Sequence, residues 1–211
     1  MKANVTAPDK ALKVVGRQWF LLEHVLAVRT GHSYTCHDME GRRRRRPETS
    51  IRLRNMGFRD SYPPGTFCWI QHMTHDRQAT RDYYGALFDW AFDETGRAAR
   101  QERAVAGIGA PDDASTTAPP HWLSFVSVED ADTMVQKAEG LGAQILASPV
   151  DVGTSGRMAM LRDPLGVNLA LWEPPQSHGA QLVNQHGSLC WNELLTHDAD
   201  ADGSFYTTLF D

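Results

Sequence analysis

The sequence contains few cysteines and no long hydrophobic run. Its three cysteines, Cys36, Cys68 and Cys190, are an odd number without paired spacing, so they do not form a disulfide framework. Reduced thiols favour a cytoplasmic protein. The longest apolar run, around Trp19 to Val28, is interrupted by charge, is far shorter than the ~20 residues of a membrane-spanning helix and lacks a secretory cleavage site. We therefore expect no membrane association.

Several common functional motifs are also missing. The chain has no phosphate-binding loop and no dinucleotide fingerprint. His32, Cys36 and His37 lack a second pair at zinc-finger spacing, which favours loop residues over a metal site. Asp198 to Gly203 imitates the opening of a calcium loop, but the twelfth position is Leu209, where a bidentate Glu is required.

Charge divides the chain into two unlike parts. The 211 residues carry a net charge of −5, but residues 1–62 are basic and the remainder is acidic. The run Arg42 to Arg46 has no accompanying aromatic residues, so we expect a solvated tail without a nucleic-acid partner. We predict that residues 1–62 are a basic, irregular tail, either disordered or a non-native extension ahead of a true start at Met56.

One 22-residue stretch occurs twice. Residues 68–89, CWIQHMTHDRQATRDYYGALFD, and residues 190–211, CWNELLTHDADADGSFYTTLFD, agree without a gap at ten of twenty-two positions. Such self-similarity indicates a duplicated structural unit. Alternation over residues 67–74 predicts a strand with Phe67, Trp69, Gln71 and Met73 on one face and Cys68, Ile70 and His72 on the other. Asp76 can cap the amphipathic helix that follows.

The second copy, with Asp198 as the helix cap, stops at the last residue. It therefore predicts a truncated second domain at 187–211, after a linker at 175–186, with an open strand edge and an uncovered apolar stripe on its helix.

Between the copies lies a strand–helix–three-strand pattern. A strand is predicted at 121–128, with Leu123 and Phe125 on one face, followed by a helix capped at Glu129-Asp130. Further strands are predicted at 144–147, 157–161 and 167–172. Residues 66–110 predict a shortened version of this plan, with short strands at 90–93 and 104–108 and a polar segment between them. The fold class is therefore α+β.

The segments CWIQHMTHDRQATRDYYGALFDWAF, PHWLSFVSVEDADTMVQKAEGLGAQIL and GRMAMLRDPLGVNLALWEP together resemble the vicinal oxygen chelate superfamily of glyoxalase I, extradiol dioxygenases and bleomycin-resistance proteins. The resemblance covers residues 63–174 as one domain, with modules 66–110 and 121–173, and 187–211 as the start of another. It implies paired βαβββ modules that form a curled mixed sheet around a cavity. By analogy it also implies a homodimer.

The same resemblance implies where a metal would bind. In metal-dependent members the ligands come from the first and last strands of each module, and carrying these positions over gives Trp69, Leu123, Ala170 and the vicinity of Ala106 or Gly107. None of these side chains offers a lone pair to a divalent cation. We therefore expect no metal and no cofactor in this domain.

Aromatic and amide side chains take the neighbouring positions in that register. The predicted ligand-binding residues are Trp69, Gln71, His121, Phe125, Asn168 and Trp172, with Met158 or Met160 on the adjacent strand. Such walls suit a flat organic molecule. For Trp69 and Phe125, ordinary core packing is an equally weighted alternative.

Three hypotheses of function stay open. The first is a metal-free protein that binds a small aromatic or amphipathic molecule. The second is an enzyme, a glyoxalase-type lyase or isomerase or a dioxygenase, whose metal site lies in the missing part of the second domain or between chains. The third is a truncated, non-functional fragment. The sequence alone does not decide whether the protein is an enzyme.

Overall fold

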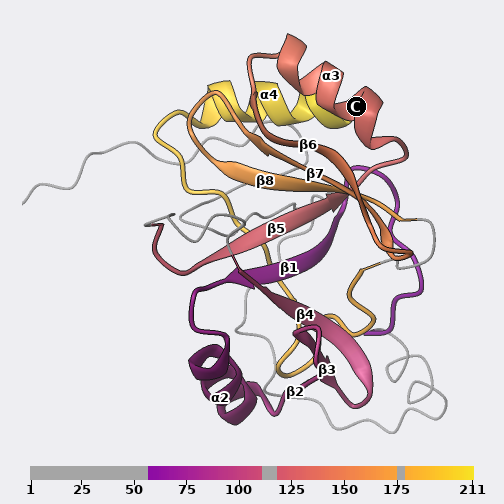
Figure 1. Ribbon diagram of the computed structural model, residues 1–211. Coiled ribbons are helices and arrows are strands. Elements are labelled where there is room, and N and C mark those ends of the chain that lie inside the picture. The colour runs from indigo at the N-terminus through magenta and orange to yellow at the C-terminus, as the bar shows by residue number, and fades with distance from the viewer. Residues whose placement is uncertain (1–56, 111–117, 175–178) are drawn as a thin grey trace, which may run out of the picture.

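The computed structural model describes residues 57–110, 118–174 and 179–211. Its centre is one curved, eight-stranded mixed sheet in the order β2-β3-β4-β1-β5-β8-β7-β6, which does not close into a barrel (Figure 1). The sequence hypotheses about Arg42 to Arg46, the His32, Cys36 and His37 group, and a start at Met56 concern residues outside these ranges. Within them, no helix is long and apolar enough to cross a membrane.

The sheet is made of two βαβββ modules with the same connectivity. In the order of the chain, the first contains β1 (Phe67–Met73), α2 (Arg77–Phe88), β2 (Ala91–Phe92), β3 (Arg97–Arg100) and β4 (Arg103–Gly109). The second contains β5 (His121–Ser127), α3 (Ala131–Gly140), β6 (Gln144–Val152), β7 (Gly156–Arg162) and β8 (Asn168–Glu173). The predicted α+β fold of paired modules is therefore confirmed.

Each module brings its first strand beside its last. β1 pairs with β4 and β5 pairs with β8, both in parallel, and the modules join where β1 and β5 run antiparallel. The first module was predicted to be shortened, but β3 completes it. β3 lies near the edge of the sheet, where only the short β2 follows it. Its sequence, RAAR, has an arginine at each end, so it lacks the apolar pattern by which a strand is predicted.

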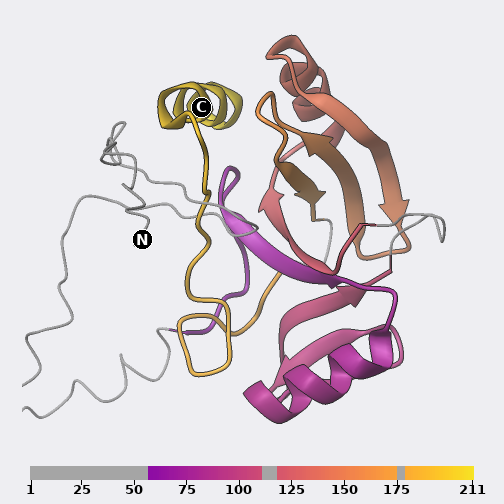
Figure 2. The same cartoon turned by 90° about the vertical axis from the view of Figure 1, so that its left-hand side faces the viewer.

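Side-chain caps begin the helices where the sequence predicts them. Asp76 Oδ1 accepts a hydrogen bond from Ala79 N at 2.8 Å, and Asp130 Oδ1 accepts one from Thr133 N at 2.7 Å. Both bonds satisfy free amide groups of the first helical turn. Figure 2 shows α2 at one end of the sheet and α3 at the other, each beside its own module.

A bulge in β1 changes the predicted faces of that strand. Phe67 pairs with Val126 and Trp69 pairs with Phe125, so Cys68 is an extra residue in the register. As a result Phe67 packs with the outer-face core around Val126, whereas Trp69 packs on the inner face. The prediction that Phe67 and Trp69 share a face is wrong, because one inserted residue reverses the alternation.

The repeated segment near the end of the chain differs from its first copy. Its helix, α4 (Ala199–Phe210), forms as predicted, with Asp198 Oδ1 accepting from Ala201 N at 3.0 Å. Residues 190–196 form no strand, which corrects the prediction for that segment, since β1 has β4 and β5 beside it and residues 190–196 have no equivalent neighbours among the described residues. A strand without pairing leaves its backbone groups unsatisfied, so this one does not form.

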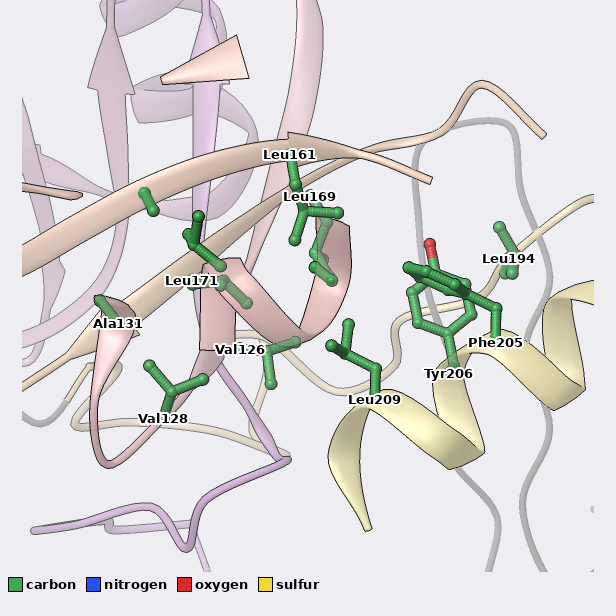
Figure 3. Packing of buried hydrophobic residues seen from close by; sticks show 13 residues of the cluster. Val126, Val128, Ala131, Leu161, Leu169, Leu171, Leu194, Phe205, Tyr206 and Leu209 are labelled. Carbon is green, nitrogen blue, oxygen red and sulfur yellow. The ribbon is translucent and has the colours of Figure 1, made fainter. Parts of the chain in front are cut away.

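The apolar stripe of α4 is buried, which corrects the prediction of an uncovered one. Phe205, Tyr206 and Leu209 pack against the outer face of the second module, where Figure 3 shows them directed toward residues such as Val126 and Leu169. Because α3 covers the same face, two helices lie over this module (Figure 1). Burial of this apolar surface holds α4 in place without a strand before it.

Segments that flank the domain cover the first module. Phe58 and Leu182 form an isolated bridge and pack with Trp90 and Val105 on the outer face. The hydroxyl of Tyr62 donates a hydrogen bond to Ala180 O at 2.6 Å. Residues 57–62 and 179–183 are therefore packed against the domain in the structure.

Candidate functional site

The inner face of the sheet is formed by alternate residues of β4, β1, β5, β8 and β7. The strand register aligns Gly107 with Gln71 and Gln71 with Leu123, and it aligns Phe125 with both Trp69 and Ala170. Residues that are aligned across a sheet point to the same side. Met158 opposite Trp172, and Met160 opposite Ala170, continue this face on β7.

A cavity of about 520 Å³ opens on this inner face. Its apolar walls are Trp69, Phe125, Met158 and Trp172, and the ring centres of Phe125 and Trp172 lie 6.4 Å apart in an edge-to-face arrangement. Its rims come from two hairpin turns. One is formed by residues 95–97, before and at the start of β3, and the other by Val152, Gly153 and Ser155, at the end of β6 and in the turn before β7. The cavity therefore lies between the outer hairpins of the two modules and is large enough for a small organic molecule.

Four of the six predicted binding residues line this cavity, namely Trp69, Gln71, Phe125 and Trp172. Of the two methionines, Met158 lines it, and Met160 packs beneath it in the inner-face cluster. The three aromatic side chains differ in their exposure to solvent: Phe125 is buried, whereas Trp69 and Trp172 are half-buried. The two indoles thus present ring surface to the cavity.

His121 and Asn168, the other two predicted binding residues, are not among the residues that line this cavity. His121 Nδ1 lies 2.9 Å from Pro119 O, and Asn168 Oδ1 accepts a hydrogen bond from Arg162 Nε at 2.9 Å. Each residue precedes a lining residue, Phe125 or Trp172, by four positions on the same strand. At about 3.3 Å per residue, His121 and Asn168 each lie ~13 Å along the strand from that lining residue, although their side chains point to the same face of the sheet.

Glycine in β4 makes room for the polar part of the cavity. A Cβ atom on Gly107 would lie 3.2 Å from Trp69 Nε1 and 3.3 Å from Gln71 Oε1. The indole and the amide therefore occupy the space that a side chain from β4 would need. Gln71 Nε2 also lies 3.5 Å from Met73 Sδ, which orients the amide along the strand.

The inner face does not fit a divalent metal ion. Trp69, Leu123 and Ala170 face inward as the family register requires, and the β4 position is Gly107, while Ala106 packs on the outer face. Of these neighbouring positions only Gln71 adds an oxygen donor, and one amide oxygen is insufficient for a protein metal site. Across residues 57–110, 118–174 and 179–211, no three His, Cys, Asp or Glu residues are grouped to hold a metal.

Sequence reasoning missed the turn that precedes β3. Asp93 Oδ1 accepts hydrogen bonds from Thr95 Oγ1 at 2.6 Å and from Arg97 N at 2.9 Å, and Gly96 has a φ of +95°. An Asp followed three residues later by Gly is a hairpin signal, and it could have located this turn. The turn brings Arg97 to the cavity rim, with its guanidinium 6.0 Å from the centre of the Trp69 ring.

The buried thiol of Cys68 lies behind the cavity and not in it. Cys68 is fully buried, and its Sγ lies 3.6 Å from Phe125 O. Burial raises the pKa of this thiol to about 12, so it stays protonated at neutral pH. A protonated buried thiol is a poor nucleophile, which favours a packing role for Cys68.

His72 lies on the opposite face of β1, as its position in the strand predicts. Its ring centre is 5.3 Å from that of Tyr84 on α2 and 5.0 Å from that of Trp122 on β5. Burial, with a smaller contribution from His121, lowers its pKa, so the ring is neutral near pH 7. His72 therefore belongs to the packing between α2 and the sheet.

Paired βαβββ modules with a cavity on the inner face of a curled sheet define the fold and the site. The chain belongs to the Glyoxalase/Bleomycin resistance protein/Dioxygenase superfamily, whose profile matches residues 66–171. This confirms the family that the sequence resembles.

The chain is also similar to individual proteins. The chain is 35% identical over 161 residues to the Mycobacterium tuberculosis protein named "Putative glyoxylase CFP32", covering 72% of this chain and 62% of the relative. It is 27% identical over 165 residues to the anthracycline biosynthesis protein DnrV of Streptomyces peucetius, covering 69% and 60%. A methylmalonyl-CoA epimerase from Mycobacterium tuberculosis matches with a TM-score of 0.38 at 16% identity, over 51% of this chain and 87% of that one. The chain spans about three fifths of the length of the two curated relatives, the glyoxylase and DnrV.

Proposed function

We propose that the protein binds a small aromatic or amphipathic molecule in the inner-face cavity and does so without a metal ion. The observation that supports this proposal is the cavity of about 520 Å³ between Trp69, Phe125 and Trp172, whose family metal positions hold Trp, Leu, Ala and Gly. Aromatic walls provide large apolar contact areas and edge or face contacts to a flat ring. Sequestration or sensing of such a molecule is the role we propose.

Binding of neutral 2-naphthamide, measured by titration calorimetry, tests the proposal. We expect saturable binding at one site and a loss of about tenfold or more in affinity in Trp172→Ala, because this change removes one wall of the cavity. Trp191→Ala is the control, since Trp191 is 51% exposed and does not line the cavity. Circular dichroism melting verifies that both variants fold. Absence of saturable binding to the unaltered protein would contradict the proposal and favour plain core packing.

A metal titration tests the second half of the proposal. Under it, Mn²⁺, Ni²⁺ and Zn²⁺ neither bind stoichiometrically in equilibrium dialysis nor raise the melting temperature, because Trp69, Leu123 and Ala170 offer no ligand atom. One tightly bound ion per chain, or per pair of chains, would contradict the metal-free hypothesis.

A glyoxalase-type lyase or isomerase, or a dioxygenase, is the alternative, with its metal site outside residues 63–174. The observation that favours it is the 35% identity to a relative named as a glyoxylase, of which this chain spans 62%. A stoichiometric ion in the metal titration would support this alternative. We also propose that the protein is cytoplasmic, that it forms a homodimer and that a second domain begins at residue 187. Light scattering in solution would test the dimer.

A further inference from the structure

We infer that the cavity selects aromatic molecules that carry a carboxylate, and that Arg97 recognises this group. The inference rests on the proposed function, since it names the class of ligand for the same cavity. It depends on the balance of charge around the cavity and on the contacts that the neighbouring arginines make.

Of the described residues that line the cavity, only Arg97 has a formally charged side chain. The other lining residues are aromatic, aliphatic or glycine, together with the neutral polar residues Gln71, Thr95 and Ser155. The described lining residues include no Asp or Glu that would balance this positive charge. A ligand with one negative group would therefore neutralise the cavity, whereas a cationic ligand would be repelled.

The Arg97 guanidinium makes no ion pair and no hydrogen bond with any described residue, whereas the guanidinium groups of three other arginines all contact oxygen atoms. Arg157 pairs with Asp132 at 2.9 Å and with Asp151 at 3.2 Å. Arg77 donates to Thr95 O at 2.6 Å, and Arg81 donates to Asp93 O at 2.7 Å. Among the described residues, the contact of the Arg97 guanidinium is with the face of Trp69, 6.0 Å from the ring centre. Its planar set of N–H donors is therefore available to a ligand.

The backbone of Arg97 is held in place at the cavity rim, and its exposed side chain extends from that fixed position. Asp93 Oδ1 accepts from Arg97 N, and Arg97 is aligned across the sheet with Gly107, which is aligned with Gln71. These three positions form one row on the inner face. Since Gly107 has no side chain, nothing from β4 separates Arg97 from Trp69 and Gln71.

This row predicts the order of contacts that a ligand would make. A flat ring would lie among Trp69, Phe125 and Trp172, and a carboxylate at its edge would reach Arg97 with the Gln71 amide beside it. Carboxylate is favoured because the guanidinium fork matches its two oxygens with parallel hydrogen bonds. The aromatic contact and the charge contact are supplied by different residues, so they can be tested separately.

Three naphthalene compounds with the same ring but different charge provide the test. 2-Naphthoate, 2-naphthamide and 2-naphthylmethylammonium are titrated into the full chain, with calorimetry as the readout. We expect 2-naphthoate to bind about five- to tenfold more tightly than the amide, as a charged hydrogen bond at an exposed arginine allows, and the ammonium compound to bind most weakly. Raising the salt concentration should weaken only the naphthoate complex.

Substitution of Arg97 assigns the preference to a residue. Arg97→Gln should bring the naphthoate affinity down to that of the amide while the amide affinity stays unchanged, and Arg97→Lys should keep part of the preference. Arg103→Gln is the matched control, because Arg103 lies over the Phe58 ring at 4.4 Å and does not line the cavity. Melting temperatures of all three variants verify folding.

The outcomes separate this inference from the proposed function. The inference is wrong if naphthoate and the amide bind equally to the unaltered protein, or if Arg97→Gln keeps the preference for naphthoate. Either result is still consistent with the proposed aromatic binding cavity. Failure of every naphthalene compound to bind overturns the proposed function and this inference with it.

Discussion

The hydroxyl of Tyr206 donates a hydrogen bond of 2.6 Å to Asp163 Oδ2, which joins the last helix of the chain to the turn between β7 and β8. Asp163 is buried, and its other oxygen accepts from Leu165 N at 3.0 Å and Val167 N at 2.8 Å. Burial, together with the nearby Asp163 carboxyl, raises the pKa of Tyr206, so the phenol stays protonated and remains a donor. One carboxylate thus closes a turn and anchors α4.

Tyr206→Phe should lower the free energy of unfolding by about 1 to 3 kcal/mol, because it leaves a buried carboxylate oxygen without its donor. Urea denaturation followed by circular dichroism measures this change. Tyr83→Phe is the control, since Tyr83 is 62% exposed, and its effect should stay below about 0.5 kcal/mol. Equal effects of the two substitutions would show that the contact with Asp163 contributes nothing.

The two copies of the repeated segment offer a matched comparison. Leu87 and Leu209 have equivalent places in the repeat, but Leu87 is 55% exposed on α2 and Leu209 is fully buried under α4. We expect Leu209→Ala to cost about 2 to 4 kcal/mol of stability and Leu87→Ala less than about 1 kcal/mol. Denaturant titration measures both. If Leu209→Ala were as mild as Leu87→Ala, α4 would not be packed on the second module in solution.

This comparison also shows what the sequence could and could not predict. The repeat and the Asp76 and Asp198 caps located α2 and α4 correctly, because capping and helical periodicity are local properties. The partner of α4 was beyond such patterns, since burial of Leu209 depends on side chains such as Val126 and Leu169, which are distant in the sequence. For the same reason, the strand predicted at 190–196 lacked the neighbours that make β1 a strand.

Within the candidate site, the face of the sheet to which a side chain points was easier to predict than its distance along the strand from the cavity. The register carried over from the family resemblance placed Trp69, Gln71, Phe125 and Trp172 on the inner face, where they line the cavity. It gave His121 and Asn168 the same face but not their distance from the cavity. The bulge at Cys68 and the turn that positions Arg97 depend on pairing between strands, which a single sequence shows only weakly.

Asp202 predicts a pH dependence of stability. This α4 residue is 2% exposed, and neither of its carboxylate oxygens makes a hydrogen bond that meets normal geometry among the described residues. Burial raises its pKa from 3.8 to about 6, with Asp163 and Asp198 adding to the effect and Thr196 opposing it. The unfolded chain therefore loses this proton at lower pH than the folded chain does.

The contribution of Asp202 to stability should fall as the pH rises from about 4 to 6 and then level off, because Asp202 holds its proton to higher pH in the folded state than in the unfolded state. Asp202→Asn should be more stable than the unaltered protein at pH 7.5, by roughly 2 kcal/mol, and this advantage should shrink toward pH 4. Urea titrations across this pH range measure the difference. Asp200→Asn, on the exposed side of α4, should show no such trend, and a pH-independent gain in Asp202→Asn would contradict the assignment.

Gly107→Val tests whether the gap in β4 creates the cavity. A Cβ atom there would lie 3.2 Å from Trp69 Nε1, and the two methyl groups of Val would extend into the space of the indole and the Gln71 amide. We expect a loss of about tenfold or more in the affinity for 2-naphthamide and a cost of about 1 to 3 kcal/mol from overpacking. Gly140→Ala is the control, since a Cβ atom on Gly140 would meet nothing within 4 Å. Calorimetry and urea denaturation of both variants measure the two effects, and unchanged naphthamide binding in Gly107→Val would place the ligand away from β4.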